Sequence, residues 1–223
     1  MSKSNIKLQC SYCGEAFAKT VIKRHLEKCE VGEKRNEPGK SNYYWIQVRG
    51  YKDYCMYLDV AADAYLQDID EFLRSNWLEC CGHLSMFRIG DTLYDSDSSS
   101  SVMLGDFGVE GKSMKVKLTS VLSVGMEFIH EYDFGSTTVL KLKVLSLKKA
   151  AKRKQKIVLM ARNLPPAFEC VVCGKAAEQV CCECIYEEDA YFCDDCGKNH
   201  ECGEDMMLPI VNSPRMGVCA YCG

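Results

Sequence analysis

Three cysteines and one histidine near the N-terminus have the types and the spacing of a metal site. Two residues separate Cys10 from Cys13, and three separate His25 from Cys29. A tight turn can carry the first pair, while positions 25 and 29 lie one helical turn apart and point the same way. Thiolate and imidazole groups are the ligands of tetrahedral zinc sites. We therefore predict one zinc ion here; the alternative is that the cysteines are isolated thiols and His25 is a surface residue.

A denser set of candidate ligands begins after residue 169. Four successive pairs predict two zinc ions with four ligands each, which leaves no open position for water and favours structural over catalytic zinc. In a cross-braced arrangement, pairs one and three share one ion, and pairs two and four share the other. Sequential pairing is the competing arrangement, and the adjacent Cys182 leaves the ligand at Cys181 ambiguous. The pairs are Cys170/Cys173, Cys181/Cys184, Cys193/Cys196 and His200/Cys202.

Two more cysteines lie close to the last residue of the sequence. Cys219 and Cys222 have the two-residue spacing of metal ligands, but Cys219 follows Cys202 by 17 positions. A role as ligands and a role as spare thiols explain them equally well. Without them, the sequence predicts about three structural zinc ions.

The cysteine content also bears on the compartment. Sixteen cysteines would suit a disulfide framework in a secreted protein, but the first ten residues, MSKSNIKLQC, contain no apolar stretch like that of a signal peptide. No run approaches the 18 or so apolar residues of a spanning helix. We therefore expect a cytoplasmic protein without membrane contact, whose clustered cysteines bind metal.

Charge is distributed unevenly along the chain, whose formal net charge is -3. Residues 1–40 carry +4, residues 41–147 carry -6, residues 148–166 carry +7 and residues 167–223 carry -8. Basic segments suit nucleic-acid phosphates and acidic ones a protein partner, although a solvated lysine face or linker explains the basic residues equally well. The candidate nucleic-acid contacts are Lys19, Lys23, Arg24, Lys28, Lys148, Lys149, Lys152, Arg153 and Lys154.

The segment between the two cysteine clusters predicts an α+β domain over residues 43–147. Residues 43–48 and 55–60 are rich in aromatic and β-branched residues and predict a strand pair, and 126–133 with 137–147 predict a hairpin. Leu66, Ile69 and Leu73 recur at helical spacing, so a helix should cover the sheet. The expected organisation is a zinc finger over 1–30, a linker over 31–42, this domain, a basic linker over 148–166 and an irregular zinc-binding module over 167–223.

Several of these segments resemble known families. The N-terminal site is similar to Cys-Cys-His-Cys fingers of the ββα type, and the C-terminal spacing resembles B-boxes, where cross-bracing is found. In the middle domain, GHLSMF at 82–87 and FIHEYDFGS at 128–136 resemble the plasmid pRiA4b Orf-3-like family, also described as TnpR-passenger-like; LPIVNSPRMGVCAYCG at 208–223 is similar to extensions of some members. The resemblance implies an α+β fold and a link to mobile elements. Ser136 and Thr138 depart from it, where the family usually has an acidic and then an aromatic residue.

These observations favour a zinc-binding, non-enzymatic interaction protein that associates with nucleic acid or is linked to mobile elements. The alternative is an enzyme or a small-ligand-binding protein with a site near His83 and His130–Asp133, because histidine and carboxylate groups can do acid–base chemistry where they converge. Hydrogen bonding of His130 and Asp133 to the turn backbone would account for both residues without catalysis. We therefore predict no catalytic residue.

Overall fold

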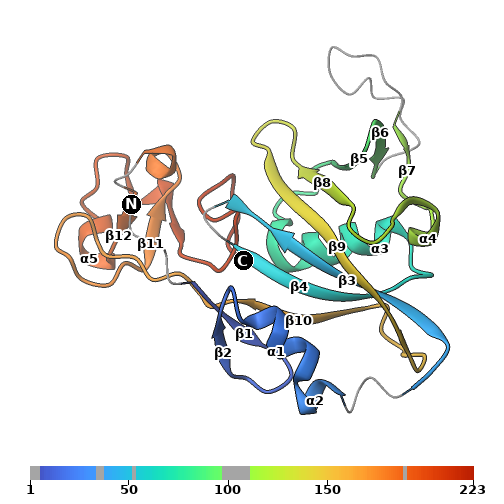
Figure 1. Cartoon of the computed structure of the whole chain (residues 1–223). Helices are drawn as coiled ribbons and strands as arrows, with labels where there is room; N and C mark the ends of the chain where they lie inside the picture. Colours follow the sequence, from blue (N-terminus) through green and yellow to red (C-terminus); the bar gives the residue numbers. More distant parts are fainter. Residues whose placement is uncertain (1–5, 34–37, 52–53, 97–110, 188–189) are drawn as a thin grey trace. The chain divides into compact units, whose positions relative to one another are not determined.

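The computed structural model describes residues 6–33, 38–51, 54–96, 111–187 and 190–223. The chain divides into two compact units (Figure 1). Unit 1 comprises Met1–Leu73 and Leu84–Leu164, and unit 2 comprises Arg74–His83 and Pro165–Gly223. The predicted α+β class is confirmed. Among the described residues, no helix is both long enough and apolar enough to cross a membrane.

Unit 1 is built on one large sheet. In its described residues the sheet has ten strands in the order β2-β1-β10-β4-β3-β9-β8-β5-β6-β7, and all neighbours are antiparallel except β6 and β7. The strands are β1 Lys7–Cys10, β2 Ala16–Ala18, β3 Ser41–Arg49, β4 Cys55–Ala61, β5 Ser85–Ile89, β6 Thr92–Asp95, β7 Lys112–Ser113, β8 Glu127–Tyr132, β9 Thr138–Ala150 and β10 Ile157–Asn163. The predicted strand pair is β3 and β4, and the predicted hairpin is β8 and β9.

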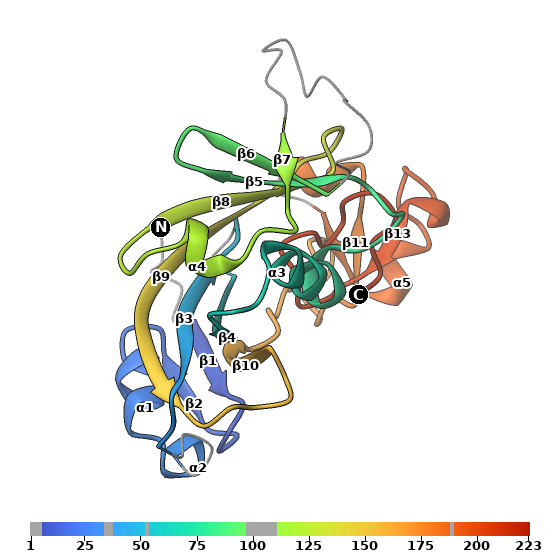
Figure 2. The ribbon, with the colours of Figure 1, turned by 90° about the vertical axis from the view of Figure 1, so that its right-hand side faces the viewer.

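Four helices accompany this sheet in the described part of unit 1: α1 Ile22–Lys28, α2 Glu30–Glu33, α3 Leu66–Leu73 and α4 Leu118–Val121. The helix predicted after residue 64 is α3. Its residues Leu66, Ile69 and Leu73 are fully buried, as their spacing predicts. Helix α3 lies against the sheet, where it contacts β10 (Figure 2).

The segment predicted as a zinc finger, here called the finger, belongs to unit 1. Strand β1 pairs with β10, so that Leu8 is opposite Asn163. Leu8, Ile22 and Leu26 of the finger share one buried cluster with Trp45 of β3 and other residues of the sheet. The finger thus extends the sheet, and its apolar residues complete a core that about thirty residues could not form alone.

Two segments predicted to be linkers contain regular secondary structure. The expected basic linker, 148–166, contains the end of β9 and all of β10, because its residues pair with β3, β4 and β1. In the expected linker at 31–42, helix α2 extends to Glu33 and β3 starts at Ser41, while residues 34–37 lie outside the described residues.

Unit 2 contains a small antiparallel sheet in the order β12-β11-β13, formed by β11 Gln179–Cys181, β12 Tyr191–Phe192 and β13 Met207–Pro209. Unit 2 also contains helix α5, Asp194–Gly197, and 3-10 turns at Cys184–Tyr186 and Glu204–Met206. The π-helical turn Arg74–Leu78, expected inside the middle domain, also belongs to this unit. Its Trp77 is fully buried, and the Trp77 carbonyl accepts a hydrogen bond from Ser213 Oγ at 2.5 Å.

Candidate metal centres

The four predicted ligands of the finger converge in the structure. One sulfur or nitrogen atom from each of Cys10, Cys13, His25 and Cys29 lies within 4.8 Å of the other three. The Cys10 and Cys29 sulfurs are 4.0 Å apart, and Cys13 Sγ is 3.4 Å from His25 Nε2. In a tetrahedral site with Zn–S bonds of about 2.3 Å, two sulfurs lie about 3.8 Å apart. The finger therefore has the dimensions of a zinc site.

The ββα order of β1, β2 and α1 positions these ligands. Cys10 ends β1, where the Gly14 N–H donates to its carbonyl at 2.9 Å and its own N–H donates to Glu15. Gly14 has a φ of +78°, a conformation that costs glycine little. Helix α1 presents His25, whose ring stacks on Phe17 with the ring centres 3.9 Å apart. This contact fixes the imidazole plane beside the thiols.

The C-terminal pairs form two groups in the cross-braced order. Cys170 and Cys173 join Cys193 and Cys196, while Cys181 and Cys184 join His200 and Cys202, again with ligand atoms within 4.8 Å. The sulfur–sulfur distance is 3.6 Å for Cys173 and Cys193 and 3.8 Å for Cys184 and Cys202, and Cys184 Sγ lies 3.4 Å from His200 Nε2. The ambiguous Cys182 lies outside both groups, with its thiol 3.7 Å from Met206 Sδ.

The first C-terminal pair repeats the turn of the finger. The Gly174 N–H donates to the Cys170 carbonyl at 2.9 Å, and the Cys170 N–H donates to Lys175. Gly174 has a φ of +72°, close to the value at Gly14. The shared Cys-x-x-Cys-Gly sequence thus produces the same turn in both units.

Several thiols stay protonated while no cation is present. Burial raises the pKa of Cys10 to about 11 and that of Cys184 to about 12. A bound cation stabilises thiolates, so metal binding at these centres releases protons. The affinity of both centres for metal therefore falls as the pH decreases.

The structure contains a fourth group of candidate metal ligands that the sequence patterns did not predict. Cys80, Cys81, His83 and Cys219 bring one ligand atom each within 4.8 Å of the others. Cys80 and Cys81 are adjacent and lack the two-residue spacer, and 136 positions separate His83 from Cys219. Two sequence features hint at this group: the Cys-Cys-Gly-His stretch at 80–83 and the Cys219/Cys222 pair. Cys222 itself belongs to none of the ligand groups among the described residues.

The donor sets fit zinc. Each group consists of thiols with one imidazole or none and contains no carboxylate, a composition that favours Zn²⁺ over Mg²⁺ or Ca²⁺. All sixteen cysteines are free thiols. Outside the four groups remain only Cys55, Cys182 and Cys222. The arrangement can hold metal ions in complete four-ligand sites.

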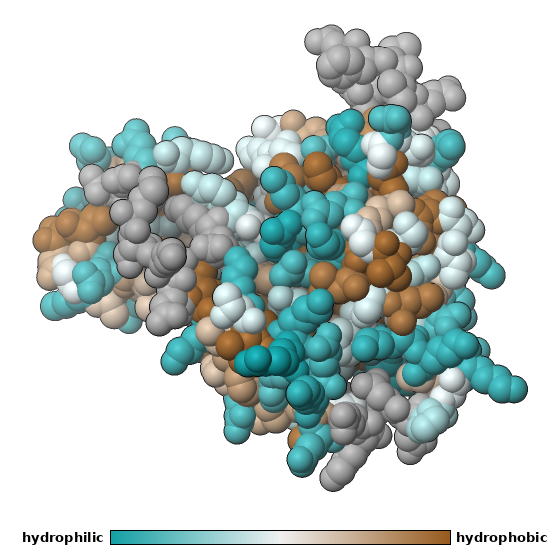
Figure 3. Space-filling model, in the orientation of Figure 1, coloured by the Kyte–Doolittle hydropathy of each residue, from teal (hydrophilic) through white to brown (hydrophobic). Residues whose placement is uncertain are grey.

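The predicted nucleic-acid contacts differ in their surroundings. Lys23, Arg24 and Lys28 are exposed on α1, and hydrophilic side chains gather at the lower centre of Figure 3 beside more hydrophobic ones. Arg153 is largely buried: its Nη2 lies 2.8 Å from Oδ2 of Asp59, and its guanidinium stacks on Tyr43. The remaining residues are half-buried Lys19 and exposed Lys148, Lys149, Lys152 and Lys154.

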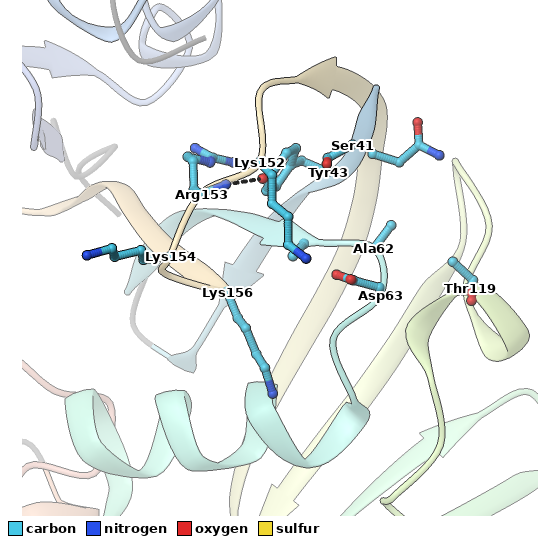
Figure 4. Close-up of a pocket in the computed structure, with 11 residues that line it drawn as sticks. Ser41, Tyr43, Ala62, Asp63, Thr119, Lys152, Arg153, Lys154 and Lys156 are labelled. Carbon is cyan, nitrogen blue, oxygen red and sulfur yellow. Dashed lines mark hydrogen bonds between the residues drawn. The ribbon is translucent and has the colours of Figure 1, made fainter. Parts of the chain in front are cut away.

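A pocket of about 430 Å³ lies beside the turn between β9 and β10. Basic residues from 152 to 156 line it together with Asn42, Asp63 and Thr119. Figure 4 shows Lys152 pointing across the pocket towards Asp63, whereas Lys154 points away. The Arg153 N–H donates to the Tyr43 hydroxyl at 2.9 Å, and this contact holds the turn on β3.

The residues of the alternative site have other partners. His83 belongs to the fourth cysteine group, and His130 is fully buried with its Nε2 2.7 Å from Asp70 Oδ1. Asp133 has a φ of +64° and accepts the Gly135 N–H at 3.0 Å, which is the expected bond to the turn backbone. These contacts account for the three residues structurally.

Comparison with known proteins leaves the family open. No family model matches the chain, and no curated protein is similar enough in sequence to match it. Among solved structures, one similar chain is a protein of unknown function from Methanosarcina mazei Go1. It is 15% identical and has a TM-score of 0.46, over 55% of this chain and 70% of that one.

Proposed function

We propose that this chain is a zinc-stabilised, non-enzymatic interaction protein that binds nucleic-acid phosphates through unit 1. The observation that carries the proposal is the set of exposed basic side chains on two segments of the same unit, helix α1 and the turn between β9 and β10. The metal centres supply the scaffold, because four protein ligands per ion leave no position for a reacting water.

The turn between β9 and β10 offers cations at a fixed place. Exposed Lys148 and Lys149 end β9, and Lys152 and Lys154 follow in the turn. The pocket beside this turn is lined by four basic residues and one acidic residue, Asp63. Two of those four have carboxylate partners, since Arg153 pairs with Asp59 and Lys156 with Asp68. Lys152 and Lys154 are both exposed, so they are the residues of this turn best suited to phosphate.

Helix α1 can add phosphate contacts but gives little base-sequence specificity by itself. Its Ile22 and Leu26 are buried against the sheet, while Lys23, Arg24 and Lys28 face outward. A single finger covers only about three base pairs, so its independent specificity would be low. Binding should therefore be governed by phosphate charge and decrease steeply with salt.

Other features of the proposal rest on charge and family resemblance. The acidic segment 167–223 suits a protein partner with a basic surface. Sixteen free thiols fit a reducing compartment such as the cytoplasm. The resemblance of residues 43–147 to the pRiA4b Orf-3-like family supports a link to mobile elements.

The test compares two variants that lose the same charge. One replaces Lys148, Lys149, Lys152 and Lys154 with Gln; the matched control replaces exposed Lys112, Lys115, Lys117 and Lys141 of the same unit. Duplex DNA binding is followed by fluorescence anisotropy over a series of salt concentrations. The first variant should lose affinity and about 0.9 of the logarithmic salt slope per contact removed. Equal losses in both variants, or no binding of the wild-type chain at low salt, would refute the nucleic-acid role.

A further inference from the structure

We propose that Cys80, Cys81, His83 and Cys219 bind a fourth zinc ion, which fastens residues 74–83 to the C-terminal part of unit 2. The ligand distances match the other centres. Cys81 Sγ lies 3.6 Å from Cys219 Sγ, and Cys219 Sγ lies 3.6 Å from His83 Nε2. Both are close to the edges of a tetrahedral zinc–thiolate site, about 3.8 Å between sulfurs, and far above the 2.05 Å or so of a disulfide bond.

The backbone bends at Cys80 and Cys81 and turns at Cys219 and Ala220. Glu79 Oε1 accepts the Gly82 N–H at 2.6 Å, and Gly82 has a φ of +75°, a conformation that costs glycine little. Cys219 has a φ of +56°, and with Asp133 it is one of two non-glycine residues with positive φ in the described residues. Such strain persists only where the surroundings hold it, and coordination of the Cys219 thiol would do so.

A buried arginine contacts one member of this group. Arg215 is completely buried, and its Nη2 lies 3.4 Å from Cys80 Sγ. This contact helps to fix the position of the Cys80 sulfur, as hydrogen bonds to ligating atoms do in metal sites.

The protein contacts of residues 74–83 show what the ion would stabilise. Trp77 and Leu78 are fully buried, and Ser213 Oγ donates to the Trp77 carbonyl while accepting the Arg215 N–H at 2.9 Å. The bond between Ser213 and Trp77 joins positions 136 apart in the sequence. A zinc ion bound to Cys81 and Cys219 would close a loop of similar length, and its binding free energy would stabilise the folded unit, because the unfolded chain has no preformed site.

Thiol reactivity in the metal-loaded chain tests the proposal without a mutation. Cys81, Cys219 and Cys222 are all exposed, but Cys222 is in none of the metal groups. After brief treatment with iodoacetamide, mass spectrometry should show Cys222 alkylated and Cys81 and Cys219 protected, and EDTA should abolish that protection. Alkylation of Cys81 and Cys219 as fast as Cys222, or protection that survives EDTA, as a disulfide would give, overturns the proposal.

Variants provide a second measurement. Cys219→Ser should lower the zinc content by one ion per chain, whereas the matched control Cys222→Ser should keep the wild-type content. If Cys219→Ser keeps all of its zinc, the fourth centre does not exist. This result does not depend on nucleic-acid binding, so a negative DNA-binding experiment would not contradict the fourth centre. If Cys219→Ser keeps its zinc, the other three candidate centres are unaffected.

Discussion

Nη2 of Arg153 lies 2.8 Å from Oδ2 of Asp59, although Arg153 stands in the most basic stretch of the chain. Asp59 is almost completely buried in β4, and the Arg153 guanidinium carbon lies 3.9 Å above the centre of the Tyr43 ring. This arginine thus holds the turn after β9 on the sheet. Its main role is structural, while the exposed lysines around it remain available to a partner.

Replacing Arg153 with Met should destabilise unit 1 by on the order of 3 kcal/mol, because a buried carboxylate loses its cation. Urea unfolding of both proteins measures the difference. Lys154→Met, at an exposed position one residue away, is the control and should have little effect. Equal stability of the Arg153 variant and the wild type would show that the pair contributes nothing.

The cost of losing Arg153 should depend on pH. Burial raises the pKa of Asp59, and Arg153 opposes that rise. A carboxyl group whose folded-state pKa is raised contributes most stability when protonated, and that contribution is lost as the pH rises through the folded-state value. Without Arg153 the pKa rises further. The stability difference between variant and wild type should therefore be small at acid pH and larger at neutral pH; the opposite trend would contradict this assignment.

Loss of the finger metal should weaken the sheet as well as the finger. Cys29→Ala removes one ligand, and Leu8, Ile22 and Leu26 share their core with β3, β4 and β10. Hydrogen exchange should therefore quicken in β10 as well as in β1. Cys55→Ala alters a buried cysteine outside every metal group and should retain all of the metal. Faster exchange confined to residues 6–29 would mean that the finger folds independently.

The two tryptophans allow each unit to be followed separately. Trp45 is buried in unit 1 and Trp77 in unit 2. In a Trp45→Phe protein, chelation should shift the Trp77 emission to the red, because unit 2 has too small an apolar core to fold without metal. Zinc should restore the emission. An unchanged spectrum after complete metal removal would show that unit 2 does not depend on metal.

Local sequence patterns predicted much of this structure. Cysteine spacing predicted three of the four groups of candidate ligands, because each of these three groups consists of two pairs of residues close together in the sequence. Strand-like composition around a short turn predicted β3, β4, β8 and β9, and helical spacing predicted α3, for the same reason.

The features that the sequence did not predict depend on contacts between segments far apart in the chain. Nothing near Leu8 indicates that β1 pairs with β10, and nothing near Cys80 points to Cys219. Likewise, the sequence around Arg153 resembles a solvated basic linker, since the buried carboxylate that it contacts lies on another strand. Such contacts depend on how distant segments fold together, which a local pattern does not encode.

Metal content per chain is the most direct test of the central claim that zinc centres form the scaffold of this protein. The native chain, purified without chelators, should contain about four zinc ions by elemental analysis, one for each of the four ligand groups. A content of three ions would contradict only the proposed fourth centre. A content near zero, or disulfides among the grouped cysteines, would contradict the whole account.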